Sequence, residues 1–223
     1  MSQRAGTDLD LSLYLVTDAA QIAAQGKSLT DVVRLAVSGG VTAVQLREKT
    51  ASTADFLRTV TEVFTVLPER VSLFVNDRVD VFLAARALGC RVTGVHLGQS
   101  DLPIALAREL IGEQPVIGLS AATPEELRTA EQQATLIDYL GIGTLHPSST
   151  KPDAPAALGI EGFRELVKQC SLPVVAIGGI GIADLPGLRR SGAAGAAVVS
   201  AICTASDPLA AAQELSRAWR TAQ

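Results

Sequence analysis

The stretch from residue 41 to residue 76 reads VTAVQLREKT ASTADFLRTV TEVFTVLPER VSLFVN. Two short apolar runs, Val41 to Leu46 and Val71 to Val75, flank a segment whose apolar residues recur at helical spacing. That segment, Thr53 to Leu67, is expected to be an amphipathic helix, and Pro68 follows it directly. The β-branched residues of both runs favour buried strands. This strand–helix–strand unit predicts an α/β fold.

The same alternation continues along the whole chain. Further strands are expected at residues 13–16, 94–97, 116–119, 137–142, 173–177 and 196–199. Helical patterns lie at 29–38 and 79–88, after Pro103, after Thr123, and at 161–170, 183–191 and 207–221. The helix after Thr123 should be capped by that hydroxyl and the last helix by Asp207. Gly39-Gly40 should end the helix at 29–38.

Eight strands that alternate with helices in 223 residues predict a single (β/α)₈ TIM barrel as the only domain, residues 1–223. An open doubly wound sheet is the alternative. Such a sheet typically has a glycine-rich turn after its first strand, whereas Thr17, Asp18 and Ala19 stand there. The barrel is therefore the better interpretation.

Composition excludes several classes of function. Hydrophobic residues make up 48% of the chain, enough for a large core, and the net charge of −4 provides no broad positive field for nucleic acid or an acidic membrane. The longest small and apolar run, Ala193 to Ala205, is shorter than the roughly 18 residues that span a bilayer. We expect no nucleic-acid partner and no membrane insertion, and a homo-oligomer stays open.

The N-terminal segment and the cysteines bear on where in the cell the protein works. Met1 to Asp10 is polar, lacks the apolar core of a signal peptide and is expected to be a flexible N-terminus. The three cysteines, Cys90, Cys170 and Cys203, are far apart and fit no metal-ligand spacing. We interpret them as thiols in a reducing compartment, which predicts a cytoplasmic protein.

Polar or glycine residues follow seven consecutive predicted strands. Catalytic groups of such barrels sit at the carboxyl ends of the strands. In chain order these residues are Arg47 and Lys49, Asn76 and Asp77, Gln99 and Asp101, Ser120, then Ser148, Ser149, Thr150 and Lys151, then Gly178 and Gly179, and finally Ser200. Loop polarity explains any one of these well but the whole ring poorly. The ring predicts a polar site at one mouth of the barrel.

Arg47 and Lys49 are two cations within three residues, directly after a buried strand. On an extended backbone their side chains point the same way, so they could bind one polyanion. The alternative is a solvated charged cap before the helix that begins near Thr53.

Asp77 and Asp101 follow neighbouring strands, which lie about 4.8 Å apart. Their carboxylates could therefore converge on one hard cation, and Mg²⁺ is commonly bound by one or two carboxylates together with substrate phosphates and water. The alternative is that each aspartate caps the helix that follows it.

Two further segments suit phosphate. Gly178-Gly179, with Ser200 after the next strand, occupies the place where barrels bind phosphate through backbone N–H groups, or else forms a plain turn leading into a helix. The loop from His146 to Asp153 carries hydroxyls and Lys151 between prolines, which suits a second phosphorylated group. Its alternative is a surface loop with incidental polarity.

Taken together, the motifs resemble the thiamine-phosphate synthase family in order, spacing and position over essentially the whole chain. They are LYLVTD (13–18), QLREK (45–49), VNDR (75–78), GVHLGQSDLP (94–103), IGLS (117–120), SSTKPDA (148–154) and AIGGI (176–180).

This resemblance implies a TIM-barrel transferase that joins hydroxymethylpyrimidine diphosphate to a thiazole phosphate and releases diphosphate, with one Mg²⁺ per active site. The catalytic residues would be Arg47, Lys49, Ser120 and Lys151. The pyrimidine diphosphate would contact Gln45, Leu46, Arg47, Glu48, Lys49, Asn76, Ser120 and Lys151. The thiazole phosphate would contact Ser148, Ser149, Thr150, Gly179, Val199 and Ser200, and the metal would be held by Asp77 and Asp101.

Three positions depart from the family pattern. The family usually has threonine where Ser148 stands, an aromatic residue near His146 and a polar residue in place of Gly181. Serine keeps the hydroxyl, so we expect altered affinity rather than lost activity.

Two rival functions stay open on this fold. A thiazole tautomerase-like isomerase would draw on His96 or His146, but it has no use for a magnesium diphosphate site. We interpret His96 as a packed histidine at a strand end. A non-catalytic barrel that binds a phosphorylated metabolite would keep Gly178-Gly179 and Ser200 but would not need two metal carboxylates.

Overall fold

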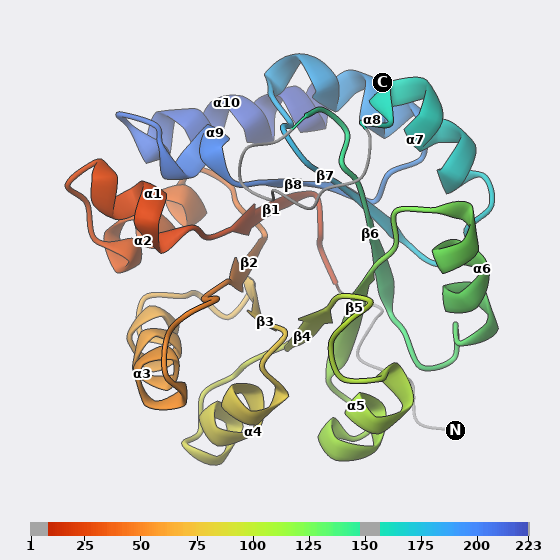
Figure 1. The fold of residues 1–223 in the computed structure, drawn as a ribbon. Coiled ribbons are helices and arrows are strands. Elements are labelled where there is room, and N and C mark those ends of the chain that lie inside the picture. The colour runs from red at the N-terminus through yellow and green to blue at the C-terminus, as the bar shows by residue number, and fades with distance from the viewer. Residues whose placement is uncertain (1–8, 148–156, 223) are drawn as a thin grey trace.

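The computed structural model describes residues 9–147 and 157–222. Eight parallel strands close into a barrel in chain order, with helices around it (Figure 1). They are β1 Leu13–Val16, β2 Ala43–Leu46, β3 Ser72–Asn76, β4 Gly94–Leu97, β5 Val116–Ser120, β6 Tyr139–Ile142, β7 Val174–Ile177 and β8 Gly195–Val198. The predicted barrel is confirmed, and the open sheet is excluded because β1 pairs with β8.

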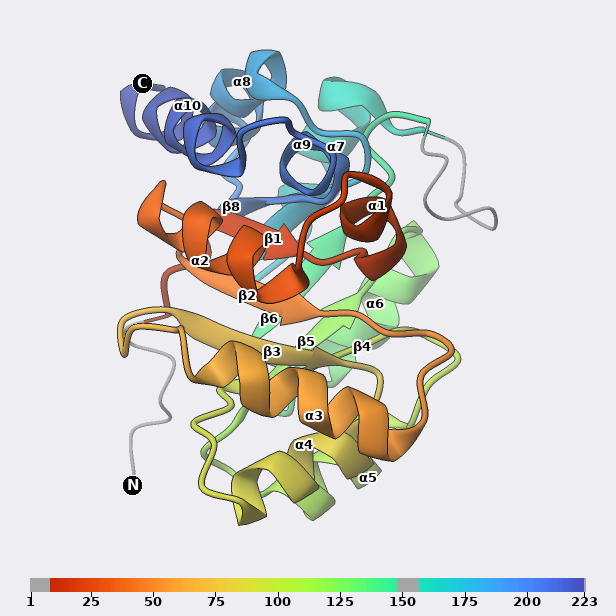
Figure 2. The same ribbon diagram turned by 90° about the vertical axis from the view of Figure 1, so that its left-hand side faces the viewer.

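The helices form the outer layer, and Figure 2 shows α2 and α3 lying along the outside of the strands. Their bounds are α1 Ala19–Ala24, α2 Leu29–Ser38, α3 Thr53–Phe64, α4 Val79–Ala87, α5 Ile104–Ile111, α6 Pro124–Gln132, α7 Gly159–Val167, the 3₁₀ turn η2 Ile182–Asp184, α8 Leu185–Arg190, α9 Ser200–Cys203 and α10 Pro208–Thr221. The sequence did not predict α1 or α9. Both are too short to show a helical period, and α1 buries only Ile22.

The predicted helix ends are confirmed where a side chain caps them. Thr123 Oγ1 accepts the N–H of Glu126 at 3.2 Å, and Glu126 Oε2 accepts the N–H of Thr123 at 3.2 Å, which forms a capping box. Asp207 Oδ1 accepts the first free N–H groups of α10. Gly40, after α2, has a φ of +111°, which glycine adopts without strain.

Side chains alternate between two separate cores, because successive residues of a strand point to opposite faces. The outer core lies between strands and helices and includes Val44 and Leu46 of β2. The inner core lies inside the barrel, where its members are Leu11, Tyr14, Val16, Ala43, Phe74, Val116, Tyr139, Val175 and Ala197. Each strand therefore delivers every second residue to the barrel interior.

The foot of the barrel, where the strands begin, is closed by a buried ion pair. Arg108 of α5 is only 4% exposed and donates to Asp138 Oδ2 at 2.8 Å. The same carboxylate oxygen accepts the N–H of Ile117 at 2.7 Å. The other guanidinium N–H groups donate to the carbonyls of Gly112, Pro115 and Leu136. The guanidinium thus joins α5 to the starts of β5 and β6.

We expect Arg108→Met to destabilise the protein by about 3 to 5 kcal/mol, because it leaves the Asp138 carboxylate buried without its cation. Urea unfolding measures this loss. The matched control is Arg34→Met, since Arg34 and Asp31 form an exposed pair within one helix, worth about 0.5 kcal/mol or less. Equal losses in the two variants would contradict the role assigned to Arg108.

Candidate active site

Four polar side chains stand at the inner face of the upper barrel, where the strands end. They are Gln45 of β2, Asn76 of β3, His96 of β4 and Ser120 of β5. Their positions continue the inner alternation of the strands, two residues beyond Ala43, Phe74, Gly94 and Gly118. Gln45, Asn76 and His96 are less than 10% exposed, and Ser120 is half-buried. These side chains form the floor of the barrel mouth.

Asp77 and Asp101 meet at this mouth, as predicted from their strand ends. Burial, and then the hydrogen-bonded Asp101 carboxylate, raise the pKa of Asp77 to about 7, while Arg47 and the Asn76 amide act in the opposite direction. Two carboxylates in such direct contact cannot both be charged without a cost in free energy. A cation held between them removes that cost, so the pair has the chemistry of a metal site.

Neither aspartate acts as the helix cap that the alternative required. The N-cap of α4 is Arg78 and that of α5 is Pro103, and neither helix start has a side-chain cap. Asp77 instead has a φ of +61°, in the left-handed region that aspartate tolerates better than most residues. Asp101 Oδ2 accepts the N–H of Gly98 at 2.6 Å, which fixes the carboxylate over the end of β4.

The donor set fits magnesium better than a transition metal. Within residues 9–147 and 157–222, no group of three or more His, Cys, Asp or Glu side chains could hold a metal by itself. Two carboxylates completed by substrate oxygens and water are the kind of site that Mg²⁺ uses.

The three charged residues after β2 lie in different surroundings. Arg47 is half-buried, its N–H donates to Thr17 Oγ1 at 3.2 Å, and its charge lowers the pKa of Asp77, so it lies beside the carboxylate pair. Glu48 is near Asp18. Burial is the larger cause, and the negative charge of Asp18 the smaller one, of a raised pKa at Glu48. Lys49 is exposed. Because β2 ends at Leu46, strand alternation does not fix the direction of Lys49, and its role stays a prediction.

Leu46 was predicted to contact the pyrimidine substrate. Its side chain is fully buried in the outer core, between the sheet and the helices. It therefore faces away from the mouth, and only its backbone can face a ligand there.

The predicted phosphate-binding turns lie at the ends of β7 and β8. Gly178 and Gly179 have φ values of +103° and +67°, so both positions favour glycine. Val199 lies between β8 and α9, and Ser200, the first residue of α9, is exposed. The other predicted contacts of the thiazole phosphate, Ser148, Ser149 and Thr150, lie outside the described residues, as does Lys151.

The sequence reasoning missed the pairing of His146 with Asp184. His146 Nε2 lies 2.8 Å from Asp184 Oδ1, and Asp184 Oδ2 accepts the N–H of Gly181 at 2.8 Å. Two of the departures from the family pattern, His146 and Gly181, are thus joined through one carboxylate. The spacing of 38 residues gave no signal in the sequence.

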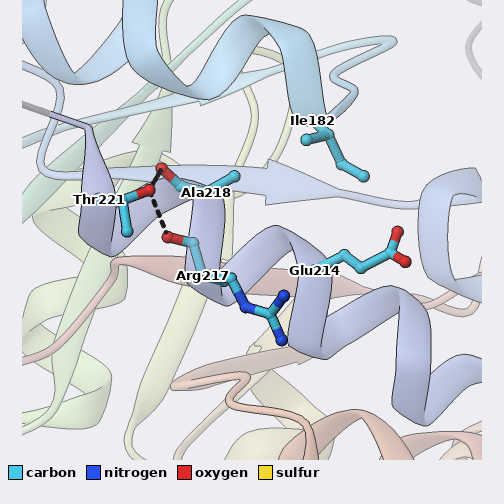
Figure 3. Close-up of a pocket in the computed structure, with 5 residues that line it drawn as sticks. All are labelled: Ile182, Glu214, Arg217, Ala218 and Thr221. Carbon is cyan, nitrogen blue, oxygen red and sulfur yellow. Dashed lines mark hydrogen bonds between the residues drawn. The ribbon is translucent and has the colours of Figure 1, made fainter.

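Figure 3 shows a hollow on the outside of the helical layer, between Ile182 and one face of α10. Glu214, Arg217, Ala218 and Thr221 complete its lining, and the Thr221 hydroxyl is bonded to the carbonyl of Arg217 at 3.0 Å. None of the predicted site residues lines this hollow, so it is not the candidate active site.

A family model described as thiamine monophosphate synthase matches residues 13–202, from the start of β1 into α9. The chain belongs to the thiamine monophosphate synthase family. The match covers all eight strand ends that build the mouth, which confirms the resemblance seen in the motifs.

Relatives and solved structures agree with this family. The chain is 44% identical to a thiamine-phosphate synthase of Syntrophomonas wolfei over 94% of its length and 97% of that protein. It is 45% identical to a thiamine-phosphate synthase of Albidiferax ferrireducens over 92% and 90% of the two chains. A thiamine phosphate pyrophosphorylase structure from Pyrococcus furiosus superposes with a TM-score of 0.82, at 36% identity and 96% and 97% coverage. A 3-hexulose-6-phosphate synthase, at 20% identity and a TM-score of 0.66, shares the fold.

Among the described residues, no helix is both long enough and apolar enough to cross a membrane.

We expect Asp77→Asn to stabilise the metal-free protein by about 1 kcal/mol, because an amide beside Asp101 removes the repulsion between the carboxylates. Asparagine also tolerates the left-handed backbone at position 77. Mg²⁺ is expected to raise the Tm of the parent protein, and the same variant should lose that increase. Thermal unfolding with and without Mg²⁺ measures both effects.

The matched control for this experiment is Asp80→Asn. Asp80 pairs with Arg78 on the exposed side of α4, so the control should keep the Mg²⁺ response. If Asp77→Asn kept that response too, Asp77 would not be a ligand.

Proposed function

We propose that the barrel mouth binds hydroxymethylpyrimidine diphosphate with Mg²⁺ and a thiazole phosphate, and joins them with release of diphosphate. The observation that carries this proposal is the convergence of Asp77 and Asp101 beside Arg47. A divalent cation and an arginine at one point suit a diphosphate. The family of the chain supplies the identity of the two substrates.

The carboxylate pair and Arg47 act on the leaving group. Mg²⁺ held by Asp77 and Asp101 would neutralise negative charge on the diphosphate as its bond to carbon breaks. Arg47 contributes a fixed positive charge beside the same position, and fixed charges cost no reorganisation during the reaction. Lys49 and Lys151 are proposed to add further positive charge to this group.

The remaining residues hold the reacting carbon and nitrogen in place. Gln45, Asn76 and Ser120 form the floor on which the pyrimidine is proposed to lie, with the backbone at 46–48 along its edge. The thiazole phosphate is proposed to sit at Gly179, Val199 and Ser200, together with residues 148–150. The thiazole nitrogen is already nucleophilic, so positioning replaces a general base.

This proposal accounts for the mouth better than its rivals. A thiazole tautomerase-like isomerase, or a barrel that only binds a phosphorylated metabolite, gives no reason to bring two half-buried carboxylates together. Both ring nitrogens of His96 are engaged with Tyr139 and Ser120, as expected for a packed histidine rather than an isomerase base.

We further propose that the protein works in the cytoplasm on small phosphorylated molecules. The free thiols of Cys90, Cys170 and Cys203 support a reducing compartment. The net charge of −4 supports the absence of a nucleic-acid partner.

The decisive assay mixes the purified protein with the pyrimidine diphosphate, the thiazole phosphate and Mg²⁺, and detects thiamine phosphate by its fluorescence after oxidation. Product should form with Mg²⁺ and stop when the metal is chelated. Interconversion of thiazole tautomers without thiamine phosphate would support the isomerase instead.

We expect Arg47→Gln to lower kcat by about 10² to 10³-fold, because it removes a charge that acts where negative charge develops. Steady-state kinetics with both substrates measure this. Arg78→Gln is the matched control, since Arg78 pairs with Asp80 on the exposed side of α4 and should leave kcat nearly unchanged. A similar loss in both variants would remove Arg47 from the proposed role.

Lys151→Ala should lower kcat far more than it raises the KM for the thiazole phosphate, because the proposed role of Lys151 is on the diphosphate. The same assay separates the two constants. Equal losses in both would assign Lys151 to the thiazole side.

A further inference from the structure

A continuous chain of hydrogen bonds crosses the interior of the barrel below the mouth. Gln45 Nε2 donates to Tyr14 Oη at 3.1 Å, and Tyr14 Oη lies 2.9 Å from Tyr139 Oη. Tyr139 Oη lies 2.9 Å from His96 Nδ1, and His96 Nε2 lies 2.9 Å from Ser120 Oγ. The chain thus begins and ends at two residues of the predicted pyrimidine site.

The protons of this chain can be placed from the donor inventory. Burial raises the pKa of Tyr14 and of Tyr139, so both phenols keep their protons near neutral pH. The Tyr14 oxygen accepts an amide proton from Gln45, and a phenol has one proton to donate. Among the described residues, the acceptor in reach of that proton is Tyr139 Oη.

The direction then propagates to the far end. Because Tyr139 Oη accepts the hydrogen bond from Tyr14, Tyr139 donates its own proton to His96 Nδ1. His96 Nδ1 must therefore be unprotonated. The neutral imidazole carries its proton on Nε2 and donates it to Ser120 Oγ. If the hydrogen bonds ran the other way, Tyr14 would accept from both Gln45 and Tyr139. The Tyr14 proton would then not have Tyr139 Oη as its acceptor.

We propose that Tyr14, Tyr139 and His96 are positioning residues that hold Ser120 as a hydrogen-bond donor toward the ligand and fix the amide of Gln45. His96 is held as the Nε2–H tautomer. Because the Ser120 oxygen accepts from His96, its hydroxyl proton is left for the ligand. Because one Gln45 N–H is bound to Tyr14, the orientation of its carbonyl and second N–H is set before the substrate arrives.

This arrangement favours one class of ring. A pyrimidine with an exocyclic amine presents a donor next to a ring-nitrogen acceptor, and a fixed amide matches that edge with its own carbonyl and N–H. An oxo group in place of the amine would oppose the Gln45 carbonyl. The proposal therefore deepens the proposed function and rests on it for the ligand, but the state of the chain does not depend on any ligand.

The barrel reserves space for the two rings at the centre of the chain. A Cβ at Gly118 would overlap the Tyr139 ring and come within 2.5 Å of His96 Nδ1. A Cβ at Gly141 would lie 3.0 Å from His96 Cε1. The inner positions of β5 and β6 beside the rings are thus glycines because the rings fill their side-chain volume. Phe74 packs against Tyr14 and Tyr139, with ring centroids 5.5 and 5.7 Å away, so the three rings form one layer.

The test of the chain is the tautomer of His96 in the ligand-free protein. The protein has two histidines, His96 and His146, so ¹⁵N-histidine labelling gives the signals of two imidazole rings. The variant His146→Gln shows which signals belong to which ring. Long-range ¹H–¹⁵N correlation at neutral pH should show His96 with its proton on Nε2. A proton on Nδ1, a doubly protonated ring or an averaged pair of tautomers in the parent protein would overturn the proposal, whatever the outcome of the activity assay.

The kinetic test uses Tyr139→Phe, which keeps the ring and removes the central hydroxyl. His96 should lose its single tautomer, and kcat/KM for the pyrimidine diphosphate should fall on the order of tenfold or more, while KM for the thiazole phosphate stays within about twofold. Tyr14→Phe should act in the same direction and serves if Tyr139→Phe does not fold.

The matched control is Phe74→Leu, which disturbs the same layer of rings without removing a hydrogen bond. It should lower Tm yet leave the His96 tautomer and the kinetic constants close to those of the parent. If the control lost as much pyrimidine activity as Tyr139→Phe, or if Tyr139→Phe kept the Nε2–H tautomer, packing alone would explain the rings and the proposal would fail.

Discussion

Closure of the parallel sheet is the constraint on which the rest of the structure depends. Once β8 pairs with β1, no strand residue can avoid facing either the helices or the barrel interior. Gln45 and Leu46 are neighbours in sequence, yet the first faces the interior and the second is buried under the helices. The interior of an eight-stranded barrel holds few side chains, so the polar side chains that lie there must form hydrogen bonds with one another. The register of the strands therefore determines which side chains face the mouth.

The elements that local pattern determines could be predicted. Strands rich in valine and leucine, helices with an apolar stripe, and caps such as Thr123 all depend on residues close in sequence. The meeting of Asp77 and Asp101 was predictable as well, because adjacent parallel strands place their ends side by side. The short helices α1 and α9 were not, since neither is long enough to show a period. The link between Tyr14 and Tyr139 joins residues 125 positions apart, and no local signal marks it.

The two ends of the barrel are built on opposite electrostatic principles. At the foot, Arg108 and Asp138 are buried with their hydrogen bonds directed to one another and to nearby backbone groups. At the mouth, Asp77 and Asp101 oppose each other, Asp77 has a left-handed backbone, and Arg47 offsets only part of the repulsion. The foot stabilises the fold, while the mouth keeps unfavourable charge that a bound cation can relieve. This division is the usual cost of a preorganised site.

The glycine at position 118 also bears on how the sequence can change. The rings of Tyr139 and His96 fill the volume that a side chain at position 118 would need, so none of the three positions can change in size independently of the others. An alanine at 118 is obstructed while the rings are present, and a smaller residue at 139 leaves a void while glycine is present. A change of volume at one of these positions therefore calls for a compensating change at another. The strong epistasis among these positions would keep the trio together over long divergence, even where its members lie far apart in the chain.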